Sequence, residues 1–303
     1  MKVGIIGSGI VGQATGMGLV ANGHQARFYD IDNRPLQTLR EKGYETTDEI
    51  EDVIDHAEAI FVCVPTPTVN KKINLKIIES CAISIGKSLR NTNKYLVITF
   101  RSTIPPQTTR TKLIPLLEAA SGLRSGEDFG VCMNPEFLRE KSPLQDFLEP
   151  NRIVVGALDK RSGDKLRNIY SNFTCPLIVT DLDTAEMIKY SSNTFLAAKI
   201  SFFNEIYLIC RKLGIDEKVV SDAVALDPRI GKYGVFGGTP FGGMCLPKDL
   251  QAFIHFAGTK GINPVLLKAI AKVNQQIVQF CPESPRITSE ATTIPLEMQT
   301  TCS

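Results

Sequence analysis

Short apolar runs alternate with helical stretches along the first half of the chain. Runs of this kind, bounded by turn residues, predict buried β-strands, here over Lys2–Ile6, Gln25–Tyr29, Ala59–Val64, Tyr95–Phe100, Gly130–Met133 and Ile153–Val155. Strands that alternate with helices through short loops are typical of a doubly wound parallel sheet. We therefore predict an α/β fold, with such a sheet over residues 1–181.

The pattern changes to helical periodicity after residue 181. Thr184 to about Leu213 forms the longest helical stretch and ends at Gly214. Its length and apolar content predict a central, mostly buried helix that links two domains or forms a dimer interface. Further helices are predicted over Glu217–Leu226, after Cys245 and over Pro264–Phe280, so residues 182–280 form a mostly helical domain. Residues 281–303 carry three prolines and no periodicity, which predicts an irregular tail.

Composition narrows the classes of partner. The chain has 303 residues, which is comfortable for two domains, and its 34 basic and 32 acidic residues leave a net charge of +2. This balance indicates neither nucleic acid nor a membrane surface as a partner. The N-terminus has no basic and apolar leader, and no apolar run approaches the roughly 18 residues of a membrane span, so we expect a cytoplasmic protein.

The cysteines and histidines do not form a metal-binding pattern. Eight cysteines are scattered without a C-x-x-C pair, and three histidines are isolated in the sequence. Structural zinc sites and disulfide scaffolds both need clustered or regularly spaced ligands. We therefore expect neither a bound metal nor a disulfide framework.

A glycine-rich segment directly follows the first predicted strand. Gly7, Gly9 and Gly12 form a G-x-G-x-x-G pattern that opens a helix, with Ile10 and Val11 between the last two glycines, and Asp30 ends the next strand. This is the dinucleotide fingerprint of a Rossmann domain, in which the pyrophosphate lies at the helix N-terminus. A carboxylate at Asp30 would accept hydrogen bonds from the adenosine ribose. It favours NAD over NADP, although the nearby Arg34 leaves NADP open.

Polar segments follow three of the predicted strands, where a doubly wound sheet places its ligands. They are Pro65–Thr68, Arg101–Pro106 and Asn134–Glu140. Thr103 could hold a water molecule or the cofactor, but its segment is equally consistent with a plain turn. Glu136 and Glu140 would share a face if their segment is helical. The alternative is a solvated pair that forms ion pairs with its basic neighbours.

The second half contains a cysteine in an unusual setting. Gly237–Asp249 reads GGTPFGGMCLPKD, with glycines before Cys245 and with Pro247, Lys248 and Asp249 after it. Pro247 suits the first turn of a helix, so Cys245 would lie at a helix N-terminus, where the dipole and Lys248 favour the thiolate. Cys245 is then either a nucleophile or a small buried hydrophobic residue.

The long helix carries two further candidates. Lys189 and Asn193 are one turn apart and would point the same way. Such a pair can stabilise a developing oxyanion, or it can simply lie on the solvated face of the helix.

Together these motifs resemble the UDP-glucose/GDP-mannose dehydrogenase family, and most closely its members that oxidise UDP-glucose. The resemblance covers about residues 1–280. It is carried by the glycine pattern and by CVPTPT, RSTIPP, NPEFLRE, the lysine and asparagine of AEMIKYSSNT, and FGGMCLPKD.

The resemblance implies a cysteine-based oxidation of an alcohol to an acid. Cys245 is similar to the cysteine that attacks an aldehyde after a first hydride transfer to NAD, and a second transfer gives a thioester that water hydrolyses. The remaining catalytic residues then have family roles: Lys189 and Asn193 stabilise the oxyanion, Asp249 and Thr103 orient water, and Glu136 is the proposed base for hydrolysis.

The family also implies binding residues and an assembly. The cofactor would contact Gly7, Gly9, Ile10, Val11, Gly12, Asp30, Thr66, Thr103 and Glu140. The nucleotide-sugar substrate would contact Glu136, Leu138, Lys189, Asn193, Arg229, Gly242 and Gly243. The long helix is similar to the family's dimerisation element, so we expect a homodimer.

Two other functions stay open. Family members continue into a second Rossmann-like domain that binds the nucleotide, whereas this chain continues into a polar tail, so we expect impaired turnover or a non-catalytic NAD-binding protein. A β-hydroxyacid dehydrogenase would explain the chain length and the lysine and asparagine pair. Such an enzyme makes one hydride transfer and needs no cysteine, so FGGMCLPKD argues against it.

Overall fold

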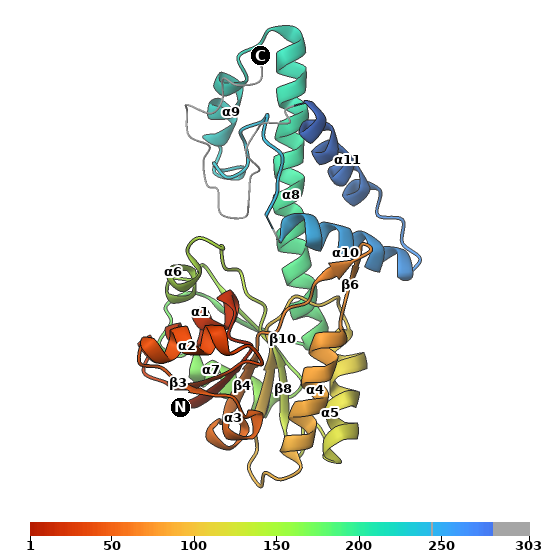
Figure 1. Ribbon diagram of the computed structural model, residues 1–303. Helices are drawn as coiled ribbons and strands as arrows, with labels where there is room; N and C mark the ends of the chain where they lie inside the picture. Colours follow the sequence, from red (N-terminus) through yellow and green to blue (C-terminus); the bar gives the residue numbers. More distant parts are fainter. Residues whose placement is uncertain (244, 281–303) are drawn as a thin grey trace. The chain divides into compact units, whose positions relative to one another are not determined.

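The computed structural model describes residues 1–243 and 245–280 (Figure 1). The predicted tail over 281–303 therefore lies outside the described residues. The chain divides into two compact units. The N-terminal unit contains Met1–Pro67 and Ile73–Lys189, and the second unit contains Thr68–Lys72 and the described residues from Tyr190 onward.

An eight-stranded sheet forms the centre of the N-terminal unit. Its strands are β1 (Lys2–Ile6), β2 (Gln25–Tyr29), β3 (Glu45–Thr47), β4 (Ala59–Val62), β7 (Val97–Phe100), β8 (Gly130–Met133), β9 (Ile153–Ala157) and β10 (Leu177–Thr180). They lie in the order β10-β9-β8-β7-β4-β1-β2-β3, so the chain changes direction across the sheet between β1 and β4. The predicted α/β fold is confirmed. β5 (Thr68–Val69) and β6 (Lys72–Ile73) form a separate two-stranded sheet.

The sequence had led us to expect a parallel sheet, but the sheet is not parallel throughout. β8 and β9 pair antiparallel, with Cys132 opposite Ala157 and Met133 opposite Gly156. All other neighbouring pairs in this sheet are parallel. Between β8 and β9 lies only the short helix α6 (Pro143–Leu148), and an antiparallel pair needs no helical crossover. Apolar runs mark where strands are, but strand direction depends on the end at which the connection re-enters the sheet.

Two hydrophobic cores cover the two faces of the sheet, because alternate side chains of each strand point to opposite sides. In β4, Ile60 and Val62 belong to one core, whereas Ala59 and Phe61 belong to the other. The first core is covered by α3 (Ile50–His56), α4 (Lys76–Leu89), the π-helix η1 (Thr109–Leu113) and α5 (Ile114–Ser121). The second is covered by α1 (Ile10–Ala21), α2 (Asn33–Glu41), α6 and α7 (Lys160–Ile169). Figure 1 shows these helices on both sides of the sheet.

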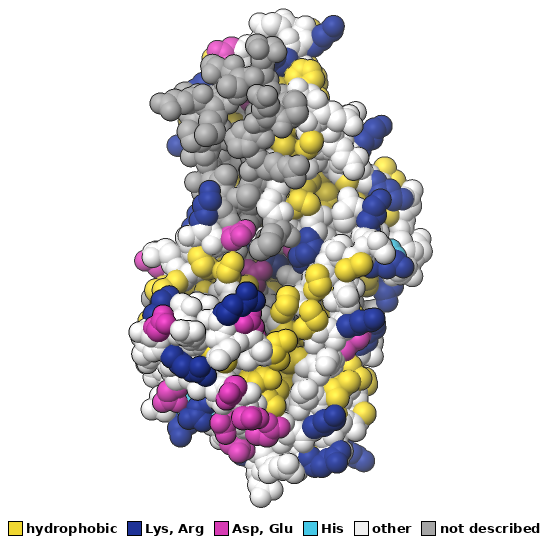
Figure 2. All heavy atoms as spheres, in the orientation of Figure 1, with side chains coloured by type: hydrophobic (Ala, Val, Ile, Leu, Met, Phe, Trp, Pro, Cys, Tyr) yellow, Lys and Arg dark blue, Asp and Glu magenta, His cyan; other side chains and the backbone are white. Residues whose placement is uncertain are grey.

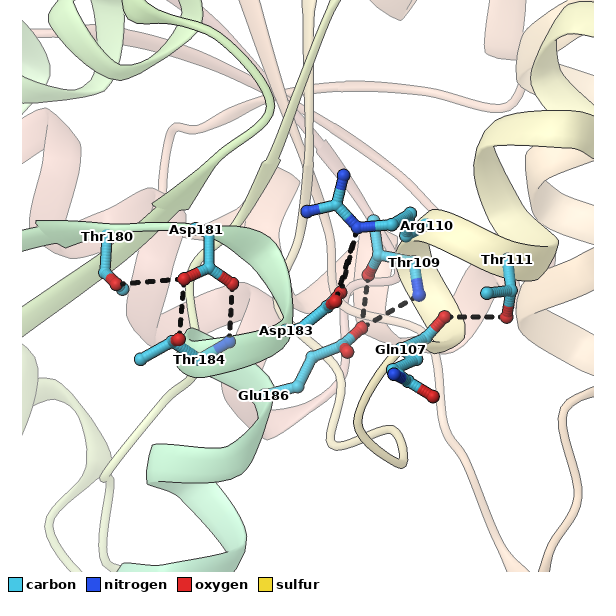
Figure 3. A network of polar contacts seen from close by, with 9 residues as sticks. All are labelled: Gln107, Thr109, Arg110, Thr111, Thr180, Asp181, Asp183, Thr184 and Glu186. Atoms are coloured by element: carbon cyan, nitrogen blue, oxygen red, sulfur yellow. Dashed lines mark hydrogen bonds and ion pairs between the residues drawn. The ribbon is translucent and has the colours of Figure 1, made fainter. Parts of the chain in front are cut away.

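Polar contacts hold the first turns of the long helix α8 (Leu182–Leu213) in the N-terminal unit (Figure 3). Asp181 accepts hydrogen bonds from the Thr184 amide (2.9 Å) and hydroxyl (2.6 Å), which satisfies groups at the helix start. Glu186 is fully buried, and one of its oxygens accepts from the Thr109 amide (2.8 Å) and hydroxyl (2.6 Å). Its other oxygen, Oε2, has no hydrogen-bond partner among the described residues. Burial raises the pKa of Glu186 to about 7, although the Thr109 bonds oppose this.

The second unit is built on the rest of α8. It adds α9 (Glu217–Ala225), α10 (Leu246–Thr259) and α11 (Val265–Phe280), as the sequence predicted. Ala197 and Ile200 of α8 pack with Leu246 and Leu250 of α10 and with Ile270 of α11. None of the helices in the described part of the chain is long and apolar enough to cross a membrane. On the face drawn in Figure 2, acidic and basic side chains are interspersed, which agrees with the near-zero net charge.

Candidate active site

The glycine-rich turn between β1 and α1 has the shape that the fingerprint predicts. Gly7 has a φ of 91°, and a Cβ on it would lie 2.9 Å from the backbone of Cys63 and Val64. A Cβ on Gly12 would lie 1.8 Å from the Gly7 carbonyl oxygen, so this helix can follow the turn only if residue 12 is glycine. A Cβ on Gly9 would instead meet nothing within 4 Å.

The open space at Gly9 fits a dinucleotide pyrophosphate. Gly9 is the N-cap of α1, where no side chain caps the helix and no acidic residue lies in the first turn. The first amide groups of α1 and its dipole are therefore available to a negatively charged group. Ile10 and Val11, also predicted to contact the cofactor, form the first turn of this helix.

Asp30 lies at the end of β2, beside this turn. Its Oδ2 accepts a hydrogen bond from the Ser8 amide (2.6 Å), and its Oδ1 accepts one from the Asp32 amide (2.9 Å). Each carboxylate oxygen retains a lone pair for a ribose hydroxyl. Arg34, which left NADP open, forms an ion pair with Asp32 through Nη2 and Oδ2 (2.6 Å). Asp32 is also the N-cap of α2, where its Oδ1 accepts a hydrogen bond from the Arg34 main-chain amide (3.0 Å).

The segments that follow β4 and β7 lie side by side. The Thr66 hydroxyl donates to the Thr103 carbonyl oxygen (2.8 Å), and the Ser102 hydroxyl donates to the Val64 carbonyl oxygen (2.6 Å). These two bonds join the PTPT and RSTIPP segments at the edge of the sheet where parallel strands end. The structure thus brings together Thr66 and Thr103, two of the residues that the sequence singled out.

Glu136 and Lys189 form a buried ion pair within the N-terminal unit. Glu136 is 9% exposed and Lys189 is 4% exposed. The Lys189 Nζ lies 2.7 Å from both the Oε1 and the main-chain oxygen of Glu136, and the Leu138 amide donates to Oε2 (2.7 Å). Burial by itself would raise the pKa of Glu136, but the ammonium of Lys189 and these hydrogen bonds outweigh it, so the pKa lies below its ordinary value. Glu136 is therefore held as a carboxylate.

Glu140 is not beside Glu136 on a helix. Residues 134–139 have no regular secondary structure, and Glu140 lies in an exposed turn. This segment does not form the helix that would have aligned the two acids, and Glu136 makes the contacts described above instead. Arg139 and Asp146 form an ion pair through Nη2 and Oδ1 (2.5 Å), which holds the end of this segment near α6.

Cys245 is the N-cap of α10, as predicted, and is half-buried. Its carbonyl oxygen accepts the first helical hydrogen bond from the Asp249 amide (2.9 Å), and Pro247 lies in the first turn, where a missing amide hydrogen is tolerated. The preceding Met244 lies outside the described residues.

Asp249 and Asn193 meet within the second unit. Asp249 is 1% exposed and Asn193 is 7% exposed, and the Asn193 amide donates to Asp249 Oδ2 (2.6 Å). Lys248 Nζ lies 2.7 Å from Asp249 Oδ1, an ion pair that lacks the geometry of a hydrogen bond, so Oδ1 has no hydrogen-bond donor in the described part of the chain. That oxygen can accept a hydrogen bond from another donor, such as a water molecule.

Three residues that hold the Cys245 loop were missed by the sequence reasoning. The Asn204 amide donates to the Thr239 carbonyl oxygen (3.0 Å), and Asn274 bonds both the amide (2.8 Å) and the carbonyl oxygen (3.0 Å) of Phe241. Glu217 accepts from the Gly237 amide (2.8 Å). The signal that could have found the two asparagines is an amide on the apolar face of a helix, because a buried amide needs a partner.

The remaining predicted substrate residues lie in loops of the second unit. Arg229 is exposed and forms an ion pair with Asp227 of the same turn (2.6 Å). Gly242 is buried, whereas Gly243 is exposed and has a φ of 73°. Within the described residues, no group of three or more histidine, cysteine, aspartate or glutamate side chains could hold a metal ion.

Comparisons with known proteins match both halves of the chain. Residues 36–174 match the NAD binding domain of the UDP-glucose/GDP-mannose dehydrogenase family, and residues 183–276 match the central domain of that family. A GDP-mannose 6-dehydrogenase from Pseudomonas syringae pv. tomato is 37% identical, over 92% of this chain and 69% of the relative. A UDP-glucose 6-dehydrogenase from Haloferax volcanii is 36% identical, over 90% of this chain and 69% of the relative.

Solved structures agree with these matches. A UDP-glucose dehydrogenase from Pyrobaculum islandicum superposes with a TM-score of 0.85 at 33% identity, over 92% of this chain and 69% of that one. A ternary complex of GDP-mannose dehydrogenase from Pseudomonas aeruginosa superposes with a TM-score of 0.72 at 33% identity, with the same coverage. The chain therefore belongs to the UDP-glucose/GDP-mannose dehydrogenase family, and its N-terminal unit contains the NAD-binding domain of that family.

Proposed function

We propose that this protein oxidises the C6 alcohol of a nucleotide sugar to a carboxylate, with two NAD molecules reduced per substrate. The observation that carries the proposal is the placement of Cys245 at the N-terminus of α10, one turn before a buried Asp249 that is bonded to Asn193. UDP-glucose, which the sequence motifs favour, and GDP-mannose are the candidate substrates, because relatives named for each are 36% and 37% identical to this chain.

A thiol is needed because the reaction removes four electrons from one carbon. When bound, NAD accepts a hydride in each of the two oxidations. Between them, the Cys245 sulfur adds to the aldehyde carbon and forms a thiohemiacetal, whose oxidation leaves a thioester. Water then attacks the thioester carbon, and the cysteine leaves as the carboxylic acid forms. The helix N-terminus behind Cys245 favours the sulfur as an anion, both in the attack and on departure.

The other site residues have roles that fit their contacts. Lys189 and Asn193 donate hydrogen bonds to the oxyanion that develops on the sugar carbon. Asp249, whose Oδ1 has an unused lone pair, orients a water molecule together with Thr103. Glu136, held as a carboxylate by Lys189, accepts the proton of the water that hydrolyses the thioester.

The binding residues complete the proposal. Gly7, Gly9, Gly12 and Asp30 would hold the pyrophosphate and ribose of NAD, and Ile10, Val11, Thr66, Thr103 and Glu140 would complete the cofactor site. Leu138, Arg229, Gly242 and Gly243 would contact the substrate. We place the domain boundaries of this function at residues 1–181 and 182–280.

We also propose a homodimer through α8. Phe195, Phe202 and Ile209 are 68%, 57% and 53% exposed, and their seven-residue spacing places them on one stripe of the helix. Covering such a stripe with a second copy would remove it from water. Size-exclusion chromatography with light scattering tests this: Phe202→Glu should convert a dimer into a monomer, and an unchanged mass would contradict it.

Mass spectrometry and NADH formation test the reaction. The full chain is incubated with NAD and with UDP-glucose or GDP-mannose, quenched, and measured as intact protein. We expect an adduct on Cys245, two NADH per sugar nucleotide consumed, and neither in Cys245→Ser. Cys175→Ser, a half-buried cysteine of the N-terminal unit, is the matched control and should behave as the wild type.

The other outcomes identify the alternatives. One NADH per substrate, unaffected by Cys245→Ser, would indicate a single oxidation of the β-hydroxyacid type. NAD binding without any NADH formation would indicate a non-catalytic binding protein. Either result contradicts the proposal, and the ratio of NADH to substrate separates them.

A further inference from the structure

Arg101 is a buried cation whose contacts are neutral. It directly follows β7 and is 5% exposed. Its Nη1 donates to the Asn134 carbonyl oxygen (3.4 Å), to Asn134 Oδ1 and to the Tyr170 hydroxyl (3.4 Å), and its guanidinium lies 5.4 Å from the centre of the Phe147 ring. Its Nε is buried and has no hydrogen-bond partner in the part of the chain that the structure describes. A charge buried in this way costs free energy unless another group compensates it.

Asn134, two residues before Glu136, is the centre of a buried hydrogen-bond network. It is 1% exposed, and its Oδ1 accepts from the Tyr170 hydroxyl (2.6 Å) as well as from Arg101. Its side-chain amide donates to the Val154 carbonyl oxygen (2.6 Å), and its main-chain amide donates to the Phe100 carbonyl oxygen (2.8 Å). These bonds leave Asn134 little freedom, and Glu136 is only two residues further along.

Two cations therefore act on the Glu136 carboxylate. Lys189 contacts Glu136 directly, and the positive charge of Arg101 also favours the ionised form of Glu136. The other titratable groups close to Arg101 are the thiol of Cys63 and the phenol of Tyr170. Burial raises the pKa of each to about 12, so both are neutral at physiological pH. Of these groups, Glu136 is the acid that is ionised and whose ionised form the charge of Arg101 favours.

We propose that Arg101 is a positioning residue for Glu136, which it holds through its hydrogen bonds to Asn134 and to whose surroundings it supplies a second positive charge in addition to that of Lys189. The geometry of this inference belongs to the N-terminal unit alone. Its consequence for catalysis rests on the proposed function, in which Glu136 accepts a proton from water. Loss of the Arg101 charge would leave Glu136 protonated over a wider pH range and unable to accept that proton.

The titration of the Glu136 carboxyl group tests the inference without any turnover. The full chain is labelled with ¹³C at glutamate carboxyl groups, and the Glu136 signal is assigned by its absence in Glu136→Gln. In Arg101→Met and Arg101→Gln we expect the Glu136 midpoint to rise, because a positive charge that favours the carboxylate has been removed. Arg101→Lys keeps the charge and should leave the midpoint close to the wild-type value.

Tyr170→Phe is the matched control for the hydrogen bonds. It removes one donor to Asn134 Oδ1 and keeps the Arg101 charge, so the midpoint should stay where it is while the melting temperature falls. A purely structural Arg101 would lower the melting temperature in the neutral variants without moving the midpoint, and that result would overturn the proposal. An equal shift in Arg101→Lys and Arg101→Met would overturn it as well.

Activity gives the second readout. If the chain turns over a sugar nucleotide, the acidic limb of the kcat profile should move to higher pH in the neutral variants and not in Arg101→Lys. If no sugar nucleotide is oxidised while the Glu136 midpoint still moves, the proposed function fails and the inference about Arg101 stands. The two failures are therefore distinguishable.

Discussion

Replacing Glu186 with glutamine should remove a pH-dependent part of the stability of the N-terminal unit. Glu186 is fully buried, Thr109 bonds only one of its oxygens, and burial raises its pKa from 4.5 to about 7 (Figure 3). In the unfolded chain this group loses its proton near its ordinary pKa, whereas in the folded chain it keeps the proton until about pH 7. Between these two values the folded state binds more protons, so stability falls as the pH rises.

The size of the effect follows from the shift. Each pKa unit corresponds to about 1.4 kcal/mol, so ionisation of Glu186 should cost about 3 kcal/mol of folding free energy once the pH exceeds its folded pKa. The full stability is present below the unfolded pKa and is lost progressively up to about pH 7. Glu186→Gln keeps the acceptor for Thr109 but cannot ionise. The difference in unfolding free energy between wild type and variant should therefore change by about 3 kcal/mol between acidic and mildly alkaline pH.

Urea unfolding, followed by circular dichroism from about pH 4 to about pH 8, measures this difference. All other titratable groups are the same in both proteins, so their contribution cancels in the comparison. Exposed Glu127 provides the control, because Glu127→Gln should leave the pH dependence of the wild type unchanged. If the difference in unfolding free energy between wild type and Glu186→Gln stays constant across this range, the reasoning is refuted, because Glu186 then does not titrate there.

Two further predictions concern the cofactor turn and the buried ion pair. Gly12→Ala places a methyl group 1.8 Å from the Gly7 oxygen and should destabilise the fold by about 2 kcal/mol or more. The methyl group of Gly9→Ala meets nothing within 4 Å, so this variant should keep the wild-type melting temperature while its NAD binding weakens. Thermal unfolding and NAD titration calorimetry check this pair, and equal melting temperatures for both variants would argue against it. Lys189→Met leaves Glu136 buried without its cation and should lower the unfolding free energy by about 3–5 kcal/mol at neutral pH. Much of this stability should return when Lys189→Met is combined with Glu136→Gln. Urea unfolding of the two variants decides it, because a double variant no more stable than the single one would show that the unpaired charge is not the cause.

Local chemistry explains why parts of the site were predictable from the sequence. A strand followed by Gly7, Gly9 and Gly12 leaves few backbone conformations open, and the structure confirms the turn and the helix that it starts. Pro247 after Cys245 predicts a helix start for the same reason, since proline is favoured in the first turn. The period of the apolar residues likewise predicts α8 almost to its ends.

What only the tertiary structure decided are the contacts between residues far apart in the chain. No spacing in the sequence relates Glu136 to Lys189, or Asn193 to Asp249, and none indicates that Arg101 donates a hydrogen bond to Asn134. The direction of β9 is of the same kind. Local preferences act over a few residues along the backbone, whereas burial and charge compensation depend on which distant segments meet. The sequence alone therefore determined six of the eight strands of the main sheet, the helices of the second unit and the chemistry that they carry. The folded chain determined which charges are paired and which groups stay ionised.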